Sequence, residues 1–364
     1  MNISEEILLK LLKAALGNTK DIDFCYDKIN WSQLYDIAEA RCVEVIAYDG
    51  LNILYKEGII PERLIPEKSI RVKFLQKTRA QEVAYLQYKH ILLDLINFFK
   101  DNKLKVMLLK GIGLSLNYPR PNHRICGDID VWMFGECAKA ADLVESKLKI
   151  PVDKSHHHHT VYMYKGVMVE DHYDFVNRHA HKSSAEIEQI LKQMALTEYK
   201  DISLDDVQFC IPTPTMNAMF LLRHSAQHFS STGINLRQLL DWATFIEKSY
   251  SDINWDLVIR FAQRYNMNIF LDSLNCICVK YLGLSRDWVP EIDVNENLVD
   301  RIIKDIIHPE FDLTPPNNGI LSLMVFKWKR WKSNIWKHKI VYNESMPLTL
   351  YTLIKSRFII PKIS

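Results

Sequence analysis

The chain has 364 residues, of which 48% are apolar, and its 46 basic residues almost balance its 44 acidic residues. This composition is typical of an ordinary soluble globular protein with two or three domains, and it excludes a membrane-spanning chain because no apolar run is long enough to cross a bilayer. The first residues lack the order of a secretion signal, and seven dispersed cysteines indicate reduced thiols and a cytoplasmic protein without a zinc framework: Cys25, Cys42, Cys126, Cys137, Cys210, Cys276 and Cys278.

The spacing of apolar residues over 1–100 predicts a helical region, which we expect to cap the part of the chain that follows. Ser4 could cap a first helix, whose apolar residues fall on one face: Ile7, Leu8, Leu11, Leu12 and Ala15. A second helix begins near Trp31 and carries Leu34, Ile37, Ala38 and Val45. A third, from about Ile70 to Phe99, has this expected buried side: Ala80, Ala84, Tyr88, Ile91, Leu92, Leu95 and Phe99. Acceptor binding is an alternative role for the region, but no residue supports it.

Residues 101–211 predict a small α/β core built on a mixed sheet. The apolar run 106–109 is typical of a strand, which ends at Lys110–Gly111 and gives way to a short helix over 112–117. The next strand alternates polar and apolar residues, so Asp128 and Asp130 share one face while Ile129 and Val131 face the core.

Two carboxylates on one strand face repel each other, and one would take up a proton unless a cation lay between them. Magnesium takes oxygen ligands and commonly uses one or two carboxylates together with substrate phosphates. Asp128 and Asp130 could instead lie on the solvated face of an edge strand. The preceding glycine turn and two arginines, Arg120 and Arg124, favour a phosphate-binding and metal-binding site.

After a helix predicted over 136–149, residues 151–175 predict two strands around the turn Tyr164–Gly166. The first strand contains the run His156–His159. Adjacent residues on a strand face opposite sides, so we expect these histidines to lie near the mouth of the site rather than to form a zinc site. In the second strand Glu170 and His172 share one face and Asp171 takes the other. His172 could contact substrate, act as a base, or simply be a packed histidine.

Residues 212–364 predict a second helical region, which starts near Thr213–Pro214. His224 and His228 lie on one helical face, but the glutamate of H-E-x-x-H is absent, which excludes metalloprotease chemistry. A helix over 236–248 carries Arg237 and Asp241, which could face a nucleotide or form a buried salt bridge.

A proline-rich break at 315–319 precedes a basic segment rich in tryptophan, residues 326–339. Such a segment could bind nucleic acid or an anionic membrane. Because the net charge of the chain is close to zero, we favour an amphipathic helix whose tryptophans pack on the domain below.

The order of motifs resembles a known family. The motifs that carry the resemblance are, in chain order, K-G-x-x-L at Lys110, Y-P, an arginine, G-D-I-D-V, and V-E-x-H ending at His172. This order is similar to that of the bacterial uncharacterised nucleotidyltransferase family, which belongs to the DNA polymerase beta-like nucleotidyltransferase superfamily. The resemblance extends from Trp31 to the H-x-x-x-H and L-R-Q-L-L-D-W segments. In place of the superfamily's usual helix-opening G-S or G-G, this chain has Lys110–Gly111, with Ser115 further on.

This resemblance implies an enzyme that transfers a nucleoside monophosphate from a nucleoside triphosphate to an unidentified acceptor, which could be a sugar, another small molecule, a protein or RNA. Asp128 and Asp130 would hold the nucleotide-bound Mg²⁺ (or Mn²⁺), and Glu170, with Asp171 as the runner-up, would place a second ion and take the proton of the attacking hydroxyl. Gly111 would let the backbone approach the phosphates.

The same resemblance makes Lys110 and, less directly, Arg124 candidates for triphosphate contacts, with His172 as a further nucleotide-binding candidate. Lys110 could equally pair with a core carboxylate. Three alternatives from other classes stay open. One is a nucleotide-binding or regulatory protein without turnover, another is a nucleic-acid-binding protein that uses 326–339, and the third is a toxin-antitoxin-like partner protein.

Overall fold

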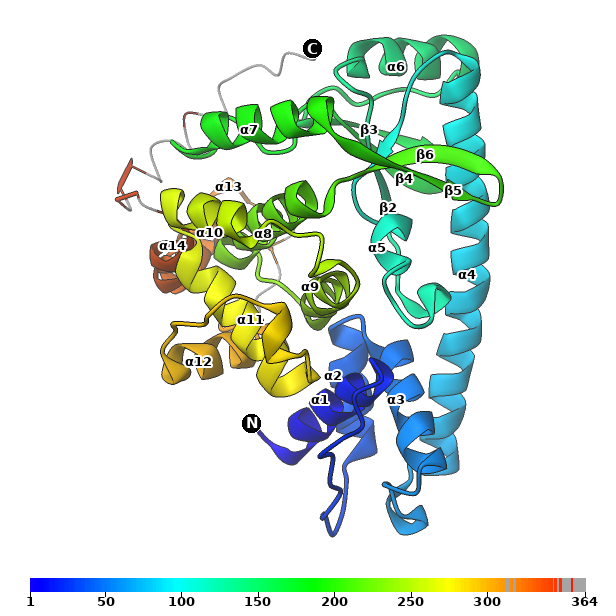
Figure 1. Cartoon of the computed structure of the whole chain (residues 1–364), viewed down its shortest axis with the longest axis vertical. Coiled ribbons are helices and arrows are strands. Elements are labelled where there is room, and N and C mark those ends of the chain that lie inside the picture. The colour runs from blue at the N-terminus through cyan, green and yellow to red at the C-terminus, as the bar shows by residue number, and fades with distance from the viewer. Residues whose placement is uncertain (312–314, 317–318, 343, 346, 349–354, 356–364) are drawn as a thin grey trace.

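The computed structural model places a twisted sheet beside one very long helix, with helices on the other side of the sheet and below it (Figure 1). It describes the whole chain except residues 312–314, 317–318, 343, 346, 349–354 and 356–364. Part of the predicted proline-rich break, Asn317 and Asn318, therefore lies outside the described residues. The expected mixed α/β class is confirmed.

Four helices make up the N-terminal part: α1 (Ile3–Ala15), α2 (Trp31–Ala40), α3 (Glu44–Lys56) and α4 (Lys68–Asp101). Asn2, and not Ser4, caps α1, because its side chain accepts the Glu5 N–H while Glu5 reaches back to the Asn2 N–H. The expected apolar face of α1 is buried. Val45 belongs to α3 and not to the second helix, since α2 ends at Ala40.

The long helix α4 runs along the sheet and extends beyond it (Figure 1). Its second half is buried as predicted at Tyr88, Leu92, Leu95 and Phe99. Ala80 and Ala84 are exposed, which corrects that part of the prediction. Helical periodicity identifies a face, but only the position of the sheet decides how far along α4 that face is covered.

The sheet has the strand order β3-β4-β2-β1-β6-β5. Its strands are β1 (Met107–Leu108), β2 (Asp128–Trp132), β3 (His159–Tyr164), β4 (Val167–His172), β5 (Tyr199–Leu204) and β6 (Val207–Pro212). Strand β2 is parallel to β4 and antiparallel to β1, which in turn is parallel to β6. The connections carry α5 (Ile112–Ser115), α6 (Cys137–Leu143) continued by a π-helix (Val144–Leu148), and α7 (Ser184–Thr197). The sheet is therefore mixed, as the sequence predicted.

The two faces of β2 belong to two different cores. Ile129 and Val131 pack with α4 residues such as Leu92 and Ile96. On the opposite face, Trp132 packs on Phe175, and both belong to the core that includes the C-terminal helices. Asp128 and Asp130 share this second face by alternation, which turns them towards the C-terminal helices.

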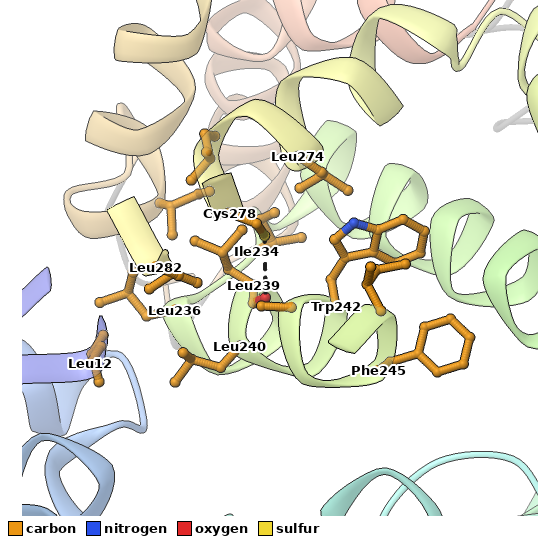
Figure 2. Packing of buried hydrophobic residues seen from close by; sticks show 14 of the residues in the cluster. Leu12, Ile234, Leu236, Leu239, Leu240, Trp242, Phe245, Leu274, Cys278 and Leu282 are labelled. Carbon is orange, nitrogen blue, oxygen red and sulfur yellow. Dashed lines mark hydrogen bonds between the residues drawn. The ribbon is translucent and has the colours of Figure 1, made fainter. Parts of the chain in front are cut away.

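The C-terminal helices are α8 (Pro214–Ser231), α9 (Leu236–Ser249), α10 (Trp255–Arg264), α11 (Asn268–Leu282), α12 (Glu296–Ile307), α13 (Ile320–Ser333) and α14 (Ile335–Val341). Figure 2 shows how leucines of α9 pack against Leu274, Cys278 and Leu282 of α11. The Cys278 thiol points at the Leu239 carbonyl, 4.0 Å away. This packing gives α9 a fixed position from which its polar side can face the sheet.

The division of the chain into three parts at residues 100 and 211 stays a prediction. Helix α4 ends beside the first of these boundaries and contacts both α3, in the N-terminal part, and β6, in the sheet. Within the part of the chain that the structure describes, no helix is both long enough and apolar enough to cross a membrane. All seven cysteines are free thiols, as predicted.

Candidate functional site

A cavity of about 530 Å³ lies where β2 and β4 face α8 and α9. Its lining includes every residue proposed for the site from the sequence: Lys110, Gly111, Arg124, Asp128, Asp130, Glu170 and His172. A larger, shallower depression of about 1000 Å³ lies at the start of α1 and α2. That depression lacks the paired carboxylates, so the chemistry points to the cavity beside β2.

Strand register brings two of the predicted carboxylates together. Asp130 on β2 is the direct partner of Glu170 on the parallel strand β4. Asp130, Glu170 and His172 each offer a ligand atom, and these atoms all lie within 4.8 Å of one another. Asp128 lines the same cavity but is not a member of that closest group. Two carboxylates and an imidazole, rather than three carboxylates, form the centre of the site.

Lys110 is held against the carboxylates by the end of β1. The Leu109 N–H donates to the Asp130 carbonyl at 3.0 Å, and the Lys110 Nζ then lies 2.6 Å from Asp130 Oδ1 and 3.2 Å from His224 Nε2. Lys110 thus pairs with a core carboxylate, which is the alternative that the sequence left open. Its ammonium still lines the cavity, where it can also meet a phosphate.

His172 lies between the two carboxylates. Its Nε2 is 3.2 Å from Asp130 Oδ1 and 3.6 Å from Glu170 Oε2, and its Nδ1 is 3.3 Å from the Asp174 carbonyl. Burial alone would lower the pKa of His172, but its hydrogen bonds to Asp130 and Glu170 outweigh burial and raise that pKa to about 9. The imidazole is therefore a cation at neutral pH.

The carboxylates of the pair on β2 differ in their affinity for protons. Burial and the neighbouring charge of Asp130 raise the pKa of Asp128. Burial also acts against ionisation of Asp130, but the charge of Lys110 and the hydrogen bond from His172 are stronger and lower its pKa. Two cations, Lys110 and His172, therefore offset the negative charge of Asp130.

Asp130 also fits a metal ion. It is 1% exposed, and its Oδ2 is buried without a hydrogen-bond partner among the described residues. A buried carboxylate oxygen without a partner is costly, and a hard divalent cation would satisfy it. Asp130, Glu170 and Asp128 thus supply the oxygen ligands that magnesium prefers.

Asp171, the runner-up for the third carboxylate, points away from the cavity. It is fully buried on the other face of β4, and its backbone carbonyl accepts the thiol of Cys137 at 3.5 Å. Burial raises the pKa of Asp171 to about 8, so this carboxyl is neutral at pH 7. The structure brings Glu170, and not Asp171, to Asp130.

Gly111 has a backbone conformation that side chains rarely adopt, with φ of +60°. A Cβ at this position would lie 2.8 Å from the Tyr88 hydroxyl, which itself donates to the Asp128 carbonyl. The glycine therefore allows α4 to approach the strand that carries the carboxylates. It also lines the cavity.

Arg124 is fully engaged by the protein. Its Nε and Nη2 donate to the two carboxylate oxygens of Asp241 at 2.7 and 2.8 Å, and the pair is buried. Tyr118 donates to the same carboxylate at 2.7 Å. Arg124 thus joins the segment before β2 to α9 through the buried salt bridge that the sequence offered as an alternative for Asp241. Arg237 donates to the Ile125 carbonyl and lines the cavity.

The histidine run corrects one expectation. Strand β3 begins only at His159, and residues 156–158 form a bend, so strand alternation does not apply to them. The His158 and His159 rings lie 4.2 Å apart and both line the cavity. Burial and the charge of His172 lower the pKa of His158 well below its usual value and lower that of His159 to about 4.

His224 and His228 also line the cavity, a position that their spacing in the sequence did not predict. Their Nε2 atoms are 3.3 Å apart on α8. Burial and the charge of Lys110 lower the pKa of both, so they are neutral imidazoles at pH 7. Their four-residue spacing showed that they share a face, but nothing in the sequence showed that the face looks onto β2.

The basic segment 326–339 divides into a packed and an exposed part. Trp336 packs edge-on against Phe229 and beneath Arg301, and Lys337 is buried against Asp305 at 2.5 Å. Trp328 is 56% exposed. The expected packing is confirmed for Trp336 but not for Trp328.

One comparison with known proteins assigns the chain to a family. A family model described as an uncharacterised nucleotidyltransferase matches residues 27–283, which include every lining residue of the cavity. Among solved structures, the chain is similar to an antigenic nucleotidyltransferase-like protein from Paracoccidioides brasiliensis, with 12% identity and a TM-score of 0.32, over 44% of this chain and 75% of that chain. A likeness this weak carries no argument. No curated protein matches the chain.

Proposed function

The chain belongs to the uncharacterised nucleotidyltransferase family, and we propose that it transfers a nucleoside monophosphate from a nucleoside triphosphate to an acceptor hydroxyl or similar nucleophile in the cavity beside β2. One observation carries the proposal. Asp130 and Glu170 are register partners on parallel strands, and Asp128 opens onto the same cavity. A bacterial origin and a relation to the DNA polymerase beta-like superfamily stay predictions.

Asp128, Asp130 and Glu170 would hold magnesium or manganese. When bound, such ions neutralise the charge that develops on the transferred phosphoryl group and on the leaving pyrophosphate. The unpartnered Oδ2 of Asp130 supports this assignment from the chain's own side. Asp130 is also the most buried of the three carboxylates, so its substitution should have the largest effect.

Lys110, Glu170 and Gly111 would bind and orient the substrates. Lys110 would direct its ammonium group to the triphosphate, and its contact with Asp130 would hold that group in position. Glu170 is only partly buried, so it can reach an acceptor and take up the proton of its attacking group. Gly111, which lines the cavity, would let the backbone approach the phosphates. The protein thus supplies position and electrostatics.

The test compares Asp130→Asn with Asp142→Asn, a matched control at an exposed position on α6. Each of the four ribonucleoside triphosphates is titrated into the native chain and both variants, with and without Mg²⁺, and pyrophosphate release is measured in parallel. We expect Mg²⁺-dependent binding of at least one nucleotide, unchanged by Asp142→Asn and weakened by a factor of at least about 10, or 1.4 kcal/mol, by Asp130→Asn.

Equal binding by the native chain and a folded Asp130→Asn variant would contradict the proposal. Mg²⁺-dependent binding without pyrophosphate release, even with candidate acceptors present, would favour the alternative of a nucleotide-binding protein without turnover. Far-UV circular dichroism and a thermal melt of each variant separate loss of binding from loss of the fold.

A further inference from the structure

Three imidazoles gather on the wall of the cavity formed by β3 and β4. The His158 and His159 rings are 4.2 Å apart, and the His172 ring is 5.2 Å from that of His159 and 5.7 Å from that of His158. One nitrogen from each histidine lies within 4.8 Å of the other two. Three nitrogen donors therefore lie close enough together to hold one metal ion.

The backbone holds this arrangement. His159 opens β3 as the direct antiparallel partner of His172. The preceding bend is fixed because the His158 carbonyl accepts two N–H groups, from Tyr173 and Asp174, each at 3.0 Å. The chain that follows β4 therefore clamps His158 beside the strand pair. Two consecutive histidines can then face the same point, which an unbroken strand would forbid.

Two of the three donor nitrogens are free to bind a metal ion. The Nδ1 atoms of His158 and His159 are buried and have no hydrogen-bond partner among the described residues. His172 Nδ1 is directed at the Asp174 carbonyl, so its Nε2 is the nitrogen that a metal ion would bind, with release of the proton that this nitrogen shares with Asp130. A backbone carbonyl that fixes one ring nitrogen in this way is the usual support behind a metal-bound histidine.

A fourth ligand is adjacent. Glu170 Oε2 is 3.8 Å from His159 Nδ1 and 3.6 Å from His172 Nε2. Three imidazoles and one carboxylate match the four-coordinate sites that zinc prefers, whereas magnesium takes oxygen ligands almost exclusively. The donor set is therefore chemically different from the carboxylates Asp128 and Asp130.

We propose that His158, His159, His172 and Glu170 form a binding site for a first-row transition-metal ion of the zinc type. The site goes beyond the proposed nucleotidyl transfer, since it selects its ion by nitrogen donors. The two sites overlap, because both use Glu170 and because His172 Nε2 also lies 3.2 Å from Asp130. Occupancy would thus change the charge that a nucleotide meets in the cavity.

The test uses Co²⁺ as a spectroscopic probe on the full chain, purified without an affinity tag and treated with chelator, in the absence of nucleotide. We expect one Co²⁺ per chain with the intense visible absorption of four-coordinate cobalt, displaced by Zn²⁺ but not by Mg²⁺. His158→Gln and His159→Gln should each weaken binding by about tenfold or more. His90→Gln, an exposed histidine on α4, serves as the matched control and should leave binding unchanged.

Absence of stoichiometric Co²⁺ binding, the weak absorption of six-coordinate cobalt, or unchanged binding by a folded His158→Gln/His159→Gln variant would each overturn the proposal. If that double variant does not fold, the native chain is modified with diethyl pyrocarbonate with and without Zn²⁺. Protection of the peptide that carries His158 and His159 supports the site, and equal modification overturns it. Because no nucleotide is present, failure here is distinct from failure of the proposed nucleotidyl transfer.

Discussion

Asp171 and Glu170 are adjacent acids on β4, and replacing Asp171 by asparagine should show that the two differ in their effects on stability and on function. Asp171 is fully buried and its two carboxylate oxygens have no hydrogen-bond partner among the described residues. Burial raises its pKa to about 8 from a usual value of 3.8. Folding therefore requires the carboxyl to hold a proton that the unfolded chain has already lost near neutral pH.

The sign follows from proton linkage. Between about pH 4 and pH 8 the native state binds one more proton at Asp171 than the unfolded state, so this group makes the protein less stable as pH rises. Each pH unit in that interval costs about 1.4 kcal/mol. From about pH 5 to pH 7.5 the native chain should thus lose roughly 3 kcal/mol that Asp171→Asn, which does not titrate, would keep.

Urea unfolding of the native chain and of Asp171→Asn, at several pH values across this interval, measures the difference directly. The buried amide of asparagine carries its own cost, which does not change with pH, so the diagnostic quantity is the slope of stability with pH and not the value at one pH. A difference that does not change with pH would refute the assignment of a buried, neutral carboxyl at Asp171.

The same variant tests the choice of third carboxylate. Asp171→Asn should keep nucleotide binding and turnover within a few-fold of the native chain, because its side chain faces away from the cavity. Glu170→Gln should lower turnover by about 100-fold or more, as expected for loss of a proton acceptor. The opposite ranking would make Asp171 the functional acid and would contradict the strand register.

Two further predictions concern the walls of the cavity. Asp241→Asn leaves the buried Arg124 without a counter-charge and should lower the free energy of unfolding by about 3 kcal/mol or more. The double variant Arg124→Met with Asp241→Leu should restore much of this loss. Equal stability of the native chain and Asp241→Asn in urea unfolding would contradict the prediction. Gly111→Ala should cost about 1–3 kcal/mol, because the new Cβ meets the Tyr88 hydroxyl at a positive φ. The same substitution in a Tyr88→Phe background should cost less, and a double-mutant cycle that shows no coupling would argue against the contact.

Local patterns in the sequence predicted much of the fold. Alternation along residues 127–132 predicted that Ile129 and Val131 face a core and that Asp128 and Asp130 share the other face, and the structure agrees. The turn at Tyr164–Gly166 predicted the β3–β4 hairpin, whose strands end and begin around it. These features depend on neighbours along the chain, which composition and period reveal.

Local patterns did not decide which residue caps α1 or how much of α4 is buried. Ser4 and Asn2 are both good capping residues, and only the reciprocal bonds between Asn2 and Glu5 decide between them. Ala80 and Ala84 continue the apolar pattern of α4, but the sheet does not reach them. Periodicity describes a face, whereas coverage of that face depends on another element.

The sequence by itself determined the mixed α/β class, the paired carboxylates of β2 and the shared face of Glu170 and His172. Only the tertiary structure decided that Lys110 pairs with Asp130 rather than standing free. It also decided that Arg124 pairs with a helix more than a hundred residues away, and that a bend before β3 turns His158 and His159 to one point. The physical reason is that a side chain's face is set by its own strand or helix, whereas its partner is set by the order and register in which distant elements pack.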